Sequence, residues 1–200
     1  MKRRSFLENA SLGAVGGATL AAPAIIRAQP QLRWRMTSSF PKSLDTLFGV
    51  CPFMAQRVRE MTDGKFEIST HAAGEIVPGL QVLDAVQAGT VECGQTASYY
   101  YVGKNTALAF DTALPFGMNC RQQNALMYYG GGMQLVRDLL RQYNIVNFPC
   151  GNTGTQMAGW YRKEIKSVAD LKGLKMRIAG LGGQILSKLG VVPQQIGGPD

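Results

Sequence analysis

The sequence has few of the side chains on which common enzyme and metal sites depend. Its 200 residues include one histidine, His71, and four cysteines that form no C-x-x-C pair. Zinc sites need clustered cysteines and histidines at short spacing, so a zinc site has no support. The chain also lacks P-loop, G-x-S-x-G and H-E-x-x-H motifs. Nucleotide binding and the familiar serine and zinc hydrolase mechanisms therefore have no support either.

Charged residues are scarce as well, at 17% of the chain, with 21 Lys and Arg against 13 Asp and Glu and a formal net charge of +8. Residues 1–28 hold four of the basic residues and one acidic residue, so 17 basic and 12 acidic residues follow them, a net charge of +5. This part of the chain has no run of Lys or Arg longer than two. Nucleic-acid-binding proteins concentrate basic residues in patches, so we expect no nucleic-acid partner.

The first 28 residues have the pattern of an export signal. A basic start is followed by a Gly/Ala-rich, weakly apolar stretch and then by small residues, as in signal peptides. Arg3 and Arg4 come close to a twin-arginine signal, which implies export of the folded protein to the periplasm. Cleavage is expected after Ala28, with Ala24 as the alternative. A membrane anchor is disfavoured because the apolar stretch is shorter than the ~20 residues of a span.

Hydrophobic residues make up 46% of the chain, which is enough for the core of one or two globular domains. In the first part of the chain, strand and helix patterns alternate, and this order predicts a parallel sheet with right-handed crossovers. We predict strands over 32–37, 65–70 and 90–96, and helices over 44–61, bent near Pro52, and over 80–88. These elements belong to a first α/β lobe over residues 29–150.

The next part of that lobe has a long helical pattern over residues 121–143, interrupted by three glycines at 130–132. Glycine is costly inside a helix, so a kink or a close helix contact is expected there. A strand over 145–150 should lead out of the lobe. Residues 151–200 then begin a second lobe, and because no closing element follows, we expect the chain to stop inside it. The elements predicted in this lobe are a strand over 174–178, a helix over 184–189 and a strand over 191–196.

Arg177 is the strongest candidate for a binding residue. It lies near the carboxyl end of the predicted strand 174–178, where open α/β sheets collect their ligands. A guanidinium at this edge is well suited to hold a carboxylate at two points. A solvated arginine, or one paired with a nearby acidic residue, is the alternative that the pattern leaves open.

The segment from Lys166 to Gly190, KSVADLKGLKMRIAGLGGQILSKLG, resembles the signature of extracytoplasmic solute-binding proteins of the TRAP (tripartite ATP-independent periplasmic) transporter family. The resemblance is to the N-terminal portion of the keto-acid or monocarboxylate branch. It implies an α/β fold of the two-lobe periplasmic solute-binding type, with mostly parallel sheets and an incomplete second lobe. It also implies that Arg177 binds the carboxylate of the solute. Gln156 would contact both that carboxylate and a metal ion, sodium or calcium, although an interlobe hydrogen bond is the alternative role for Gln156.

Two aromatic residues are further candidates for the binding site. Tyr100 is the middle residue of three tyrosines at the end of a predicted strand, and strand alternation would turn it toward the crevice. Plain packing between sheet and helix explains the same tyrosines equally well. The resemblance makes Phe116 a wall of the pocket.

These expectations describe a receptor rather than an enzyme. It would bind a small organic acid, a 2-oxoacid or other monocarboxylate, and deliver it to a TRAP permease in the membrane. An exported enzyme that processes keto acids is the alternative, with His71 as its base, and a truncated non-functional fragment is another. Which acid binds is left open, as is the presence of a homodimer.

The state of the four cysteines also stays open at this stage. The oxidising periplasm allows one or two disulfides to form, whereas buried free thiols fit a domain of this size slightly better. The cysteines lie at positions 51, 93, 120 and 150.

Overall fold

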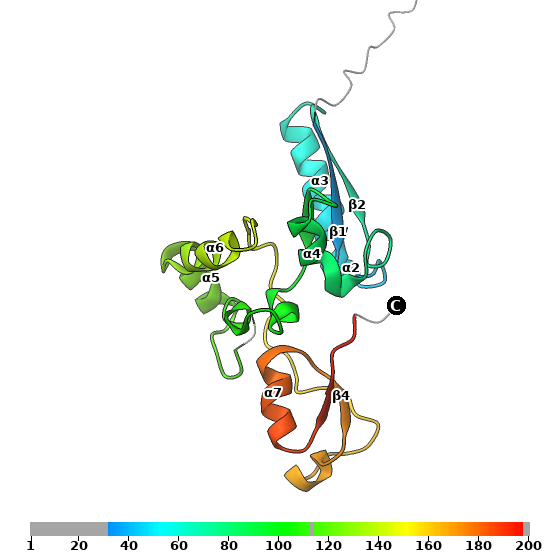
Figure 1. Cartoon of the computed structure of the whole chain (residues 1–200), viewed down its shortest axis with the longest axis vertical. Helices are drawn as coiled ribbons and strands as arrows, with labels where there is room; N and C mark the ends of the chain where they lie inside the picture. Colours follow the sequence, from blue (N-terminus) through cyan, green and yellow to red (C-terminus); the bar gives the residue numbers. More distant parts are fainter. Residues whose placement is uncertain (1–31, 113, 198–200) are drawn as a thin grey trace, which may run out of the picture.

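The computed structural model describes residues 32–112 and 114–197. The predicted signal segment, residues 1–28, lies outside the described residues. Figure 1 shows a sheet flanked by helices, a helical hairpin, and a smaller unit of strands and a helix, with a set of short turns between them. Among the described helices, none has both the length and the apolar composition that crossing a bilayer requires.

The first sheet has three parallel strands in the order β2-β1-β3. They are β1 (Leu32–Ser38), β2 (Phe66–His71) and β3 (Cys93–Gln95). All three strands were predicted, although β3 is shorter than the predicted range. Parallel strands require crossover connections, and here these contain α3 (Val50–Met61) and α4 (Val82–Gln87). The predicted alternation of strand and helix is therefore confirmed.

The helix predicted over 44–61, with a bend at Pro52, is in fact two helices. A short α2 (Asp45–Phe48) ends at Gly49, and α3 begins at the next residue. Pro52 lies in the first turn of α3, where the backbone N–H that proline lacks would have no helical partner. The break therefore falls at the glycine and not at the proline. The helix predicted over 80–88 likewise begins as a 3₁₀ turn, η1 (Gly79–Gln81), before α4.

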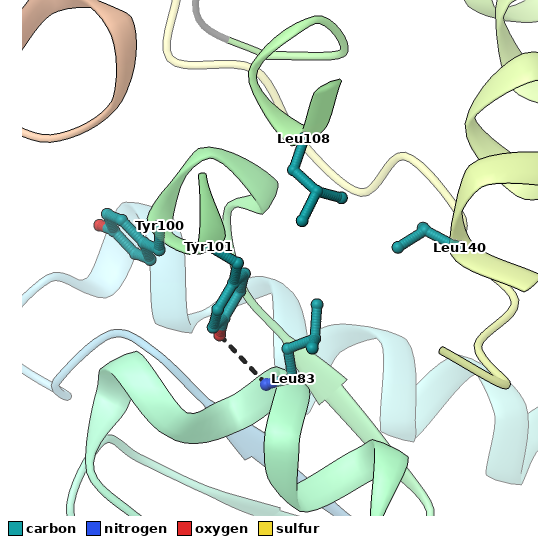
Figure 2. Packing of buried hydrophobic residues seen from close by; sticks show 5 residues of the cluster. All are labelled: Leu83, Tyr100, Tyr101, Leu108 and Leu140. Atoms are coloured by element: carbon teal, nitrogen blue, oxygen red, sulfur yellow. Dashed lines mark hydrogen bonds between the residues drawn. The ribbon is translucent and has the colours of Figure 1, made fainter. Parts of the chain in front are cut away.

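The main hydrophobic cluster joins four elements that are distant in the sequence (Figure 2). One residue comes from α4, two from the 3₁₀ helix η2 (Ser98–Tyr101), one from the 3₁₀ helix η3 (Thr106–Ala109), and one from α6 (Gly132–Arg141). The buried members are Leu83, Tyr100, Tyr101, Leu108 and Leu140. Of the three consecutive tyrosines, Tyr100 and Tyr101 lie in the core and Tyr99 packs against it, all within a 3₁₀ helix. The prediction that they end a strand is therefore wrong.

A helical hairpin follows, formed by α5 (Cys120–Tyr129) and α6. Asn119 and Gln122 begin α5 with a capping box, in which each side chain accepts a backbone N–H of the other residue. The predicted interruption at the three glycines is confirmed, and it is a full turn between two helices. Gly131 has φ 81°, a conformation that glycine adopts without strain. The strand predicted over 145–150 is wrong, because this segment has no strand partner in the described chain.

The C-terminal unit is a second, smaller parallel sheet. It consists of β4 (Lys175–Arg177), α7 (Gly180–Lys188) and β5 (Val192–Gln194), preceded by the 3₁₀ helix η4 (Val168–Leu171). Arg177 pairs with Gln194 in the register of the two strands. Both predicted strands are confirmed, and the helix begins at Gly180, four residues before the predicted start. The two sheets fall in the two predicted lobes, 29–150 and 151–200, whose boundaries remain a prediction.

The C-terminal unit contacts the core through the start of α7 and the end of β5. Ala179 packs against the hydrophobic cluster, and the Gln195 side-chain amide donates to the carbonyl oxygen of Tyr100 at 2.7 Å. Gly180, with φ +66°, lies against Tyr99 so closely that an added Cβ would be 3.4 Å from the Tyr99 Cβ. The short helix η2 therefore connects the first core with the edge of the second sheet.

Candidate functional site

The structure places Arg177 at the carboxyl end of β4, as predicted. Its side chain is exposed, and its Nε donates to the carbonyl oxygen of Ile196 at 3.2 Å. Across residues 32–112 and 114–197, no carboxylate lies in ion-pair contact with Arg177. The Ile196 bond uses Nε alone, and it leaves the two terminal nitrogens to face an anion. The alternative of pairing with a nearby acidic residue is not seen in this part of the chain.

Tyr99 packs against Gly180 at the start of α7, three residues after Arg177. Burial raises the pKa of Tyr99 to about 12, its contact with Tyr100 adds to the rise, and the nearby Arg177 charge opposes it. The Tyr99 and Tyr100 rings meet edge to face, with centroids 4.8 Å apart. The strand assumption selected the middle of the three tyrosines. Because it packs against Gly180, three residues after Arg177, Tyr99 is a further candidate that the sequence reasoning did not select.

Tyr100 has a different environment from the predicted one. It lies in η2, so strand alternation does not apply, and only 7% of the residue is exposed. Its ring packs in the hydrophobic cluster, and its backbone carbonyl accepts from Gln195. The packing alternative describes this side chain, and any contact with a solute stays a prediction.

Gln156 lies in an exposed connection and not at the end of a strand. Its amide donates to the Thr153 hydroxyl at 2.8 Å, so its position is set by a local contact three residues away. The same connection then runs alongside β4, since the Tyr161 hydroxyl donates to the Met176 sulfur at 3.8 Å and Gly159 packs on that methionine. Met176 precedes Arg177, so the chain brings the Gln156 segment to the strand that carries the arginine.

Phe116 does not form the wall of a pocket in the described chain. It is fully exposed, in the connection between η3 and α5, with φ 58°. A phenylalanine in the left-handed region is uncommon, and no buried contact here holds it there. Its predicted role in binding therefore has no support from its present position.

The carboxyl ends of β1 and β3 carry polar side chains that satisfy one another. A chain of hydrogen bonds runs from Leu83 N–H to the Tyr101 hydroxyl (3.1 Å), to Thr96 Oγ1 (2.9 Å), to Ser39 Oγ (2.6 Å) and to the carbonyl oxygen of Gly79 (2.5 Å). The two ends set its direction, because the N–H can only donate and the carbonyl can only accept. Each hydroxyl therefore accepts once and donates once. This chain orients η2 and does not present free groups to a solute.

The described residues do not make a metal centre of the His, Cys and carboxylate type: no group of three such side chains within 32–112 and 114–197 could hold an ion. Sodium and calcium prefer carboxylate, carbonyl and amide oxygens, and calcium takes six to eight of them. Gln156 offers one such oxygen. The candidate residues in the described part of the chain thus supply one ligand of a sodium or calcium site and not a complete coordination shell.

His71, the candidate base of an enzyme, is the last residue of β2. Its Nε2 lies 3.2 Å from the Ser69 hydroxyl, and its Nδ1 lies 3.8 Å from a carboxylate oxygen of Glu75. Glu75 also accepts from the side chain of Lys42 at 2.5 Å. These contacts tie β2 to the following loop, and none of them involves Arg177 or Tyr99.

The site at Arg177 is an open surface rather than a closed cavity. A hollow of about 650 Å³ lies elsewhere, between α3 and strands β1 and β2, and includes none of the candidate residues. Its lining includes an ion pair, in which Arg59 Nε lies 3.6 Å from a carboxylate oxygen of Glu67. The candidate site therefore rests on strand-end geometry, which is where α/β folds place their ligands, and not on cavity size.

Residues 37–198 match the family described as bacterial extracellular solute-binding protein, family 7. The chain belongs to this family. Its members are binding proteins outside the cytoplasm, in agreement with the expected receptor class. The mixed α/β fold with parallel sheets predicted from the resemblance is confirmed by the solved structures of TRAP solute-binding proteins that this family member matches.

A curated relative is the monocarboxylate 2-oxoacid-binding periplasmic protein of Nostoc sp., which is 55% identical over 203 residues, 99% of this chain and 56% of the relative. The TRAP transporter solute-binding protein of Bordetella bronchiseptica, a dimer crystallised with copurified calcium and picolinate, is 61% identical, with a TM-score of 0.82. The match covers 84% of this chain and 50% of the Bordetella chain.

A second solved structure is the TRAP periplasmic solute-binding protein of Pseudoalteromonas atlantica, with bound sodium and pyruvate. It is 45% identical, with a TM-score of 0.78, over 83% of this chain and 50% of that protein. The corresponding protein of Colwellia psychrerythraea, with bound calcium and pyruvate, is 43% identical, with a TM-score of 0.79, over 82% of this chain and 50% of the other. The family member described here thus spans about half the length of the relatives it matches.

Proposed function

We propose that this chain supplies the first lobe and part of the second lobe of a periplasmic TRAP receptor for short 2-oxoacids such as pyruvate. The receptor binds the acid, closes on it and delivers it to the membrane permease, and no covalent bond is made or broken. The predicted twin-arginine signal over residues 1–28 provides the route of export. The relatives that bind monocarboxylates at 43–61% identity support this choice of solute.

The observation that carries the proposal is that Arg177, at the end of β4, has its two terminal guanidinium nitrogens open to an anion. Its Nε is held by the carbonyl oxygen of Ile196, which fixes the plane of the guanidinium without neutralising its charge. A carboxylate can then accept two parallel N–H bonds from the terminal nitrogens. Such charge-assisted bonds are worth ~1.5–3 kcal/mol net, and a micromolar affinity needs ~8 kcal/mol in all. Arg177 therefore provides orientation and a fair share of the binding free energy.

The other residues have supporting roles in this proposal. Gln156 gives its amide oxygen to a sodium or calcium ion and its N–H to the solute, since a carboxamide both donates and accepts. The ion lies beside the carboxylate and adds positive charge to that of Arg177 when it is bound. Tyr99 packs against Gly180, three residues after Arg177, and Tyr100 holds η2 in place through the core. Phe116 meets the solute only if its loop closes over the site.

Calorimetric titration tests the proposal. Pyruvate and a small panel of organic acids, in buffer with calcium or sodium, should bind the chain, and Arg177→Ala should weaken binding by about 10- to 150-fold, the range that corresponds to ~1.5–3 kcal/mol. Arg177→Lys should also weaken it, because a lysine ammonium cannot reproduce the planar two-point contact.

Lys175→Ala is the matched control. Lys175 is exposed, lies two residues earlier on β4 and therefore shares a face with Arg177, so its removal changes the net charge by the same amount. It should leave the affinity within about twofold. Equal losses for the two alanine variants would show a general charge effect and contradict the specific role of Arg177. If no acid binds the protein even when it is extended at its C-terminus to the length of its relatives, the proposed solute class is wrong.

A further inference from the structure

The two residues that follow β5 contact the first core on one side and Arg177 on the other. The Gln195 side-chain amide donates to the carbonyl oxygen of Tyr100 at 2.7 Å, across 95 positions of the sequence. The backbone carbonyl oxygen of Ile196 accepts from Arg177 Nε at 3.2 Å. Because Gln195 and Ile196 are adjacent in the chain, the two hydrogen bonds connect the core to the guanidinium. We call this connection the Gln195–Ile196 link.

The core end of the link is rigid. Tyr100 is buried, and its ring packs in the hydrophobic cluster. The next residue, Tyr101, accepts through its hydroxyl from Leu83 N–H at 3.1 Å, and this bond joins η2 to α4. Closely packed core side chains have little freedom to move. The carbonyl oxygen of Tyr100 is therefore a fixed acceptor for the Gln195 amide.

The other end of the link depends on Gln195. Ile196 lies two residues beyond the end of β5 and is 58% exposed, so in the described chain neither strand pairing nor burial of its side chain holds its carbonyl in place. The Gln195 bond to Tyr100 anchors the backbone one residue before that carbonyl. Arg177 is exposed as well, and a long arginine side chain has many rotamers. The position of the Ile196 carbonyl therefore decides which of these rotamers Arg177 occupies.

We propose that Gln195 is a positioning residue for Arg177. By holding the Ile196 carbonyl, Gln195 keeps the guanidinium in one orientation before a solute arrives. Ordering a side chain in advance reduces the entropy that is lost on binding, and an ordered guanidinium plane favours the two parallel bonds that a carboxylate accepts. The identity of the anion, a short 2-oxoacid, rests on the proposed function, whereas the ordering of Arg177 needs no solute.

A purely structural role for Gln195 makes a different prediction. Arg177 and Ile196 belong to the same C-terminal unit, so their hydrogen bond should survive if Gln195 only docks that unit on η2. Docking also has a second contact, because Gly180 packs on Tyr99. The state of the Arg177 Nε–H bond therefore separates positioning from docking.

Solution NMR of the ¹⁵N-labelled chain tests the link without any solute. The signal of Arg177 Nε–H is identified by its loss in Arg177→Lys, and the exchange of this hydrogen with solvent is measured. Gln195→Met keeps the approximate length of the side chain and removes the donor. We expect this variant to speed the exchange at Arg177 Nε–H by about threefold or more, because a hydrogen-bonded N–H exchanges only when its bond opens.

Gln194→Met is the matched control. Gln194 is the neighbouring glutamine, and its amide donates to the carbonyl oxygen of the adjacent Pro193, so the exchange rate at Arg177 should not change. Gln195→Lys restores a donor of similar reach and should return the rate toward that of the unmodified chain. Equal exchange rates in Gln195→Met and the unmodified chain would overturn the proposal and leave Gln195 as a docking contact.

Calorimetry gives a second readout, on the protein extended at its C-terminus to the length of its relatives. Gln195→Met should weaken pyruvate binding by about 2- to 10-fold, the effect of leaving one flexible side chain to be ordered on binding, and Gln194→Met should not. Faster exchange at Arg177 with an unchanged affinity would also overturn the positioning role. If no acid binds the unmodified protein, the proposed function fails, and the NMR result decides the ordering of Arg177 by itself.

Discussion

The hydroxyl of Tyr101 should contribute more to stability than any surface tyrosine hydroxyl, because it replaces a missing helix cap. The side chain of Gln81, the N-cap residue of α4, makes no capping bond. The Tyr101 hydroxyl accepts instead from Leu83 N–H at 3.1 Å, one of the first N–H groups of α4 that have no helical partner (Figure 2). It donates onward to Thr96 at 2.9 Å. Only 3% of Tyr101 is exposed, so water cannot easily replace these bonds.

Tyr101→Phe removes the hydroxyl and keeps the ring. It leaves the Leu83 N–H buried without an acceptor, and the Thr96 hydroxyl loses its donor. An unsatisfied buried polar group costs ~1–3 kcal/mol, so we expect the free energy of unfolding to fall by about 2 kcal/mol. Urea denaturation followed by circular dichroism measures this change. Hydrogen exchange at Leu83 should also become faster, because its amide has lost its acceptor.

Tyr129→Phe is the control for the Tyr101 prediction. Tyr129 is 92% exposed at the end of α5, so removing its hydroxyl should change the free energy of unfolding by less than ~0.5 kcal/mol. If the two phenylalanine variants unfold at the same urea concentration with equal slopes, Tyr101 does not act as a cap. An unchanged exchange rate at Leu83 would lead to the same conclusion and would separate lost capping from a general loss of packing.

Two further predictions concern contacts between distant segments. Gln195→Ala should loosen the C-terminal unit and increase the radius of gyration in X-ray scattering, because it removes the bond to the Tyr100 carbonyl. Gln194→Ala is the control and should not, since the Gln194 amide donates to the carbonyl oxygen of the adjacent Pro193. Equal radii for the two variants would refute the contact. The side chain of Arg35 lowers the pKa of Glu92 from 4.5 to about 2, so the stabilisation from Glu92 is present above pH 4.5 and is lost as the pH falls from there toward 2. Glu92→Gln should therefore flatten the loss of stability over that interval in acid titrations, and an unchanged profile would contradict it.

The position of Arg177 could be predicted because it depends on local pattern. Alternation over 174–178 and the glycines that follow specify a strand and a helix start, and the strand end then places the arginine. The strands of the first sheet could be predicted for the same reason. The resemblance of the segment from Lys166 to Gly190 to TRAP receptors came from residues adjacent in the sequence, and the family match confirmed it.

The sequence could not decide how distant segments meet. Whether Pro52 or Gly49 breaks a helix depends on register, since proline costs little in a first turn. The direction predicted for the Tyr100 side chain depended on whether the tyrosines end a strand, and the packing of η2 on residues of α4, η3 and α6 decides that they do not.

The amino-acid sequence by itself determined the parallel sheets, the helix breaks at glycines and the arginine at a strand end. All of these follow from spacings of a few residues. Only the tertiary structure decided that η2 packs in the core, that Gln195 meets Tyr100, and that Cys51 lies against Gln95. The last two of these contacts join residues 95 and 44 positions apart. Local periodicity carries no information about such pairs, because they form only when buried apolar surface brings separate elements together.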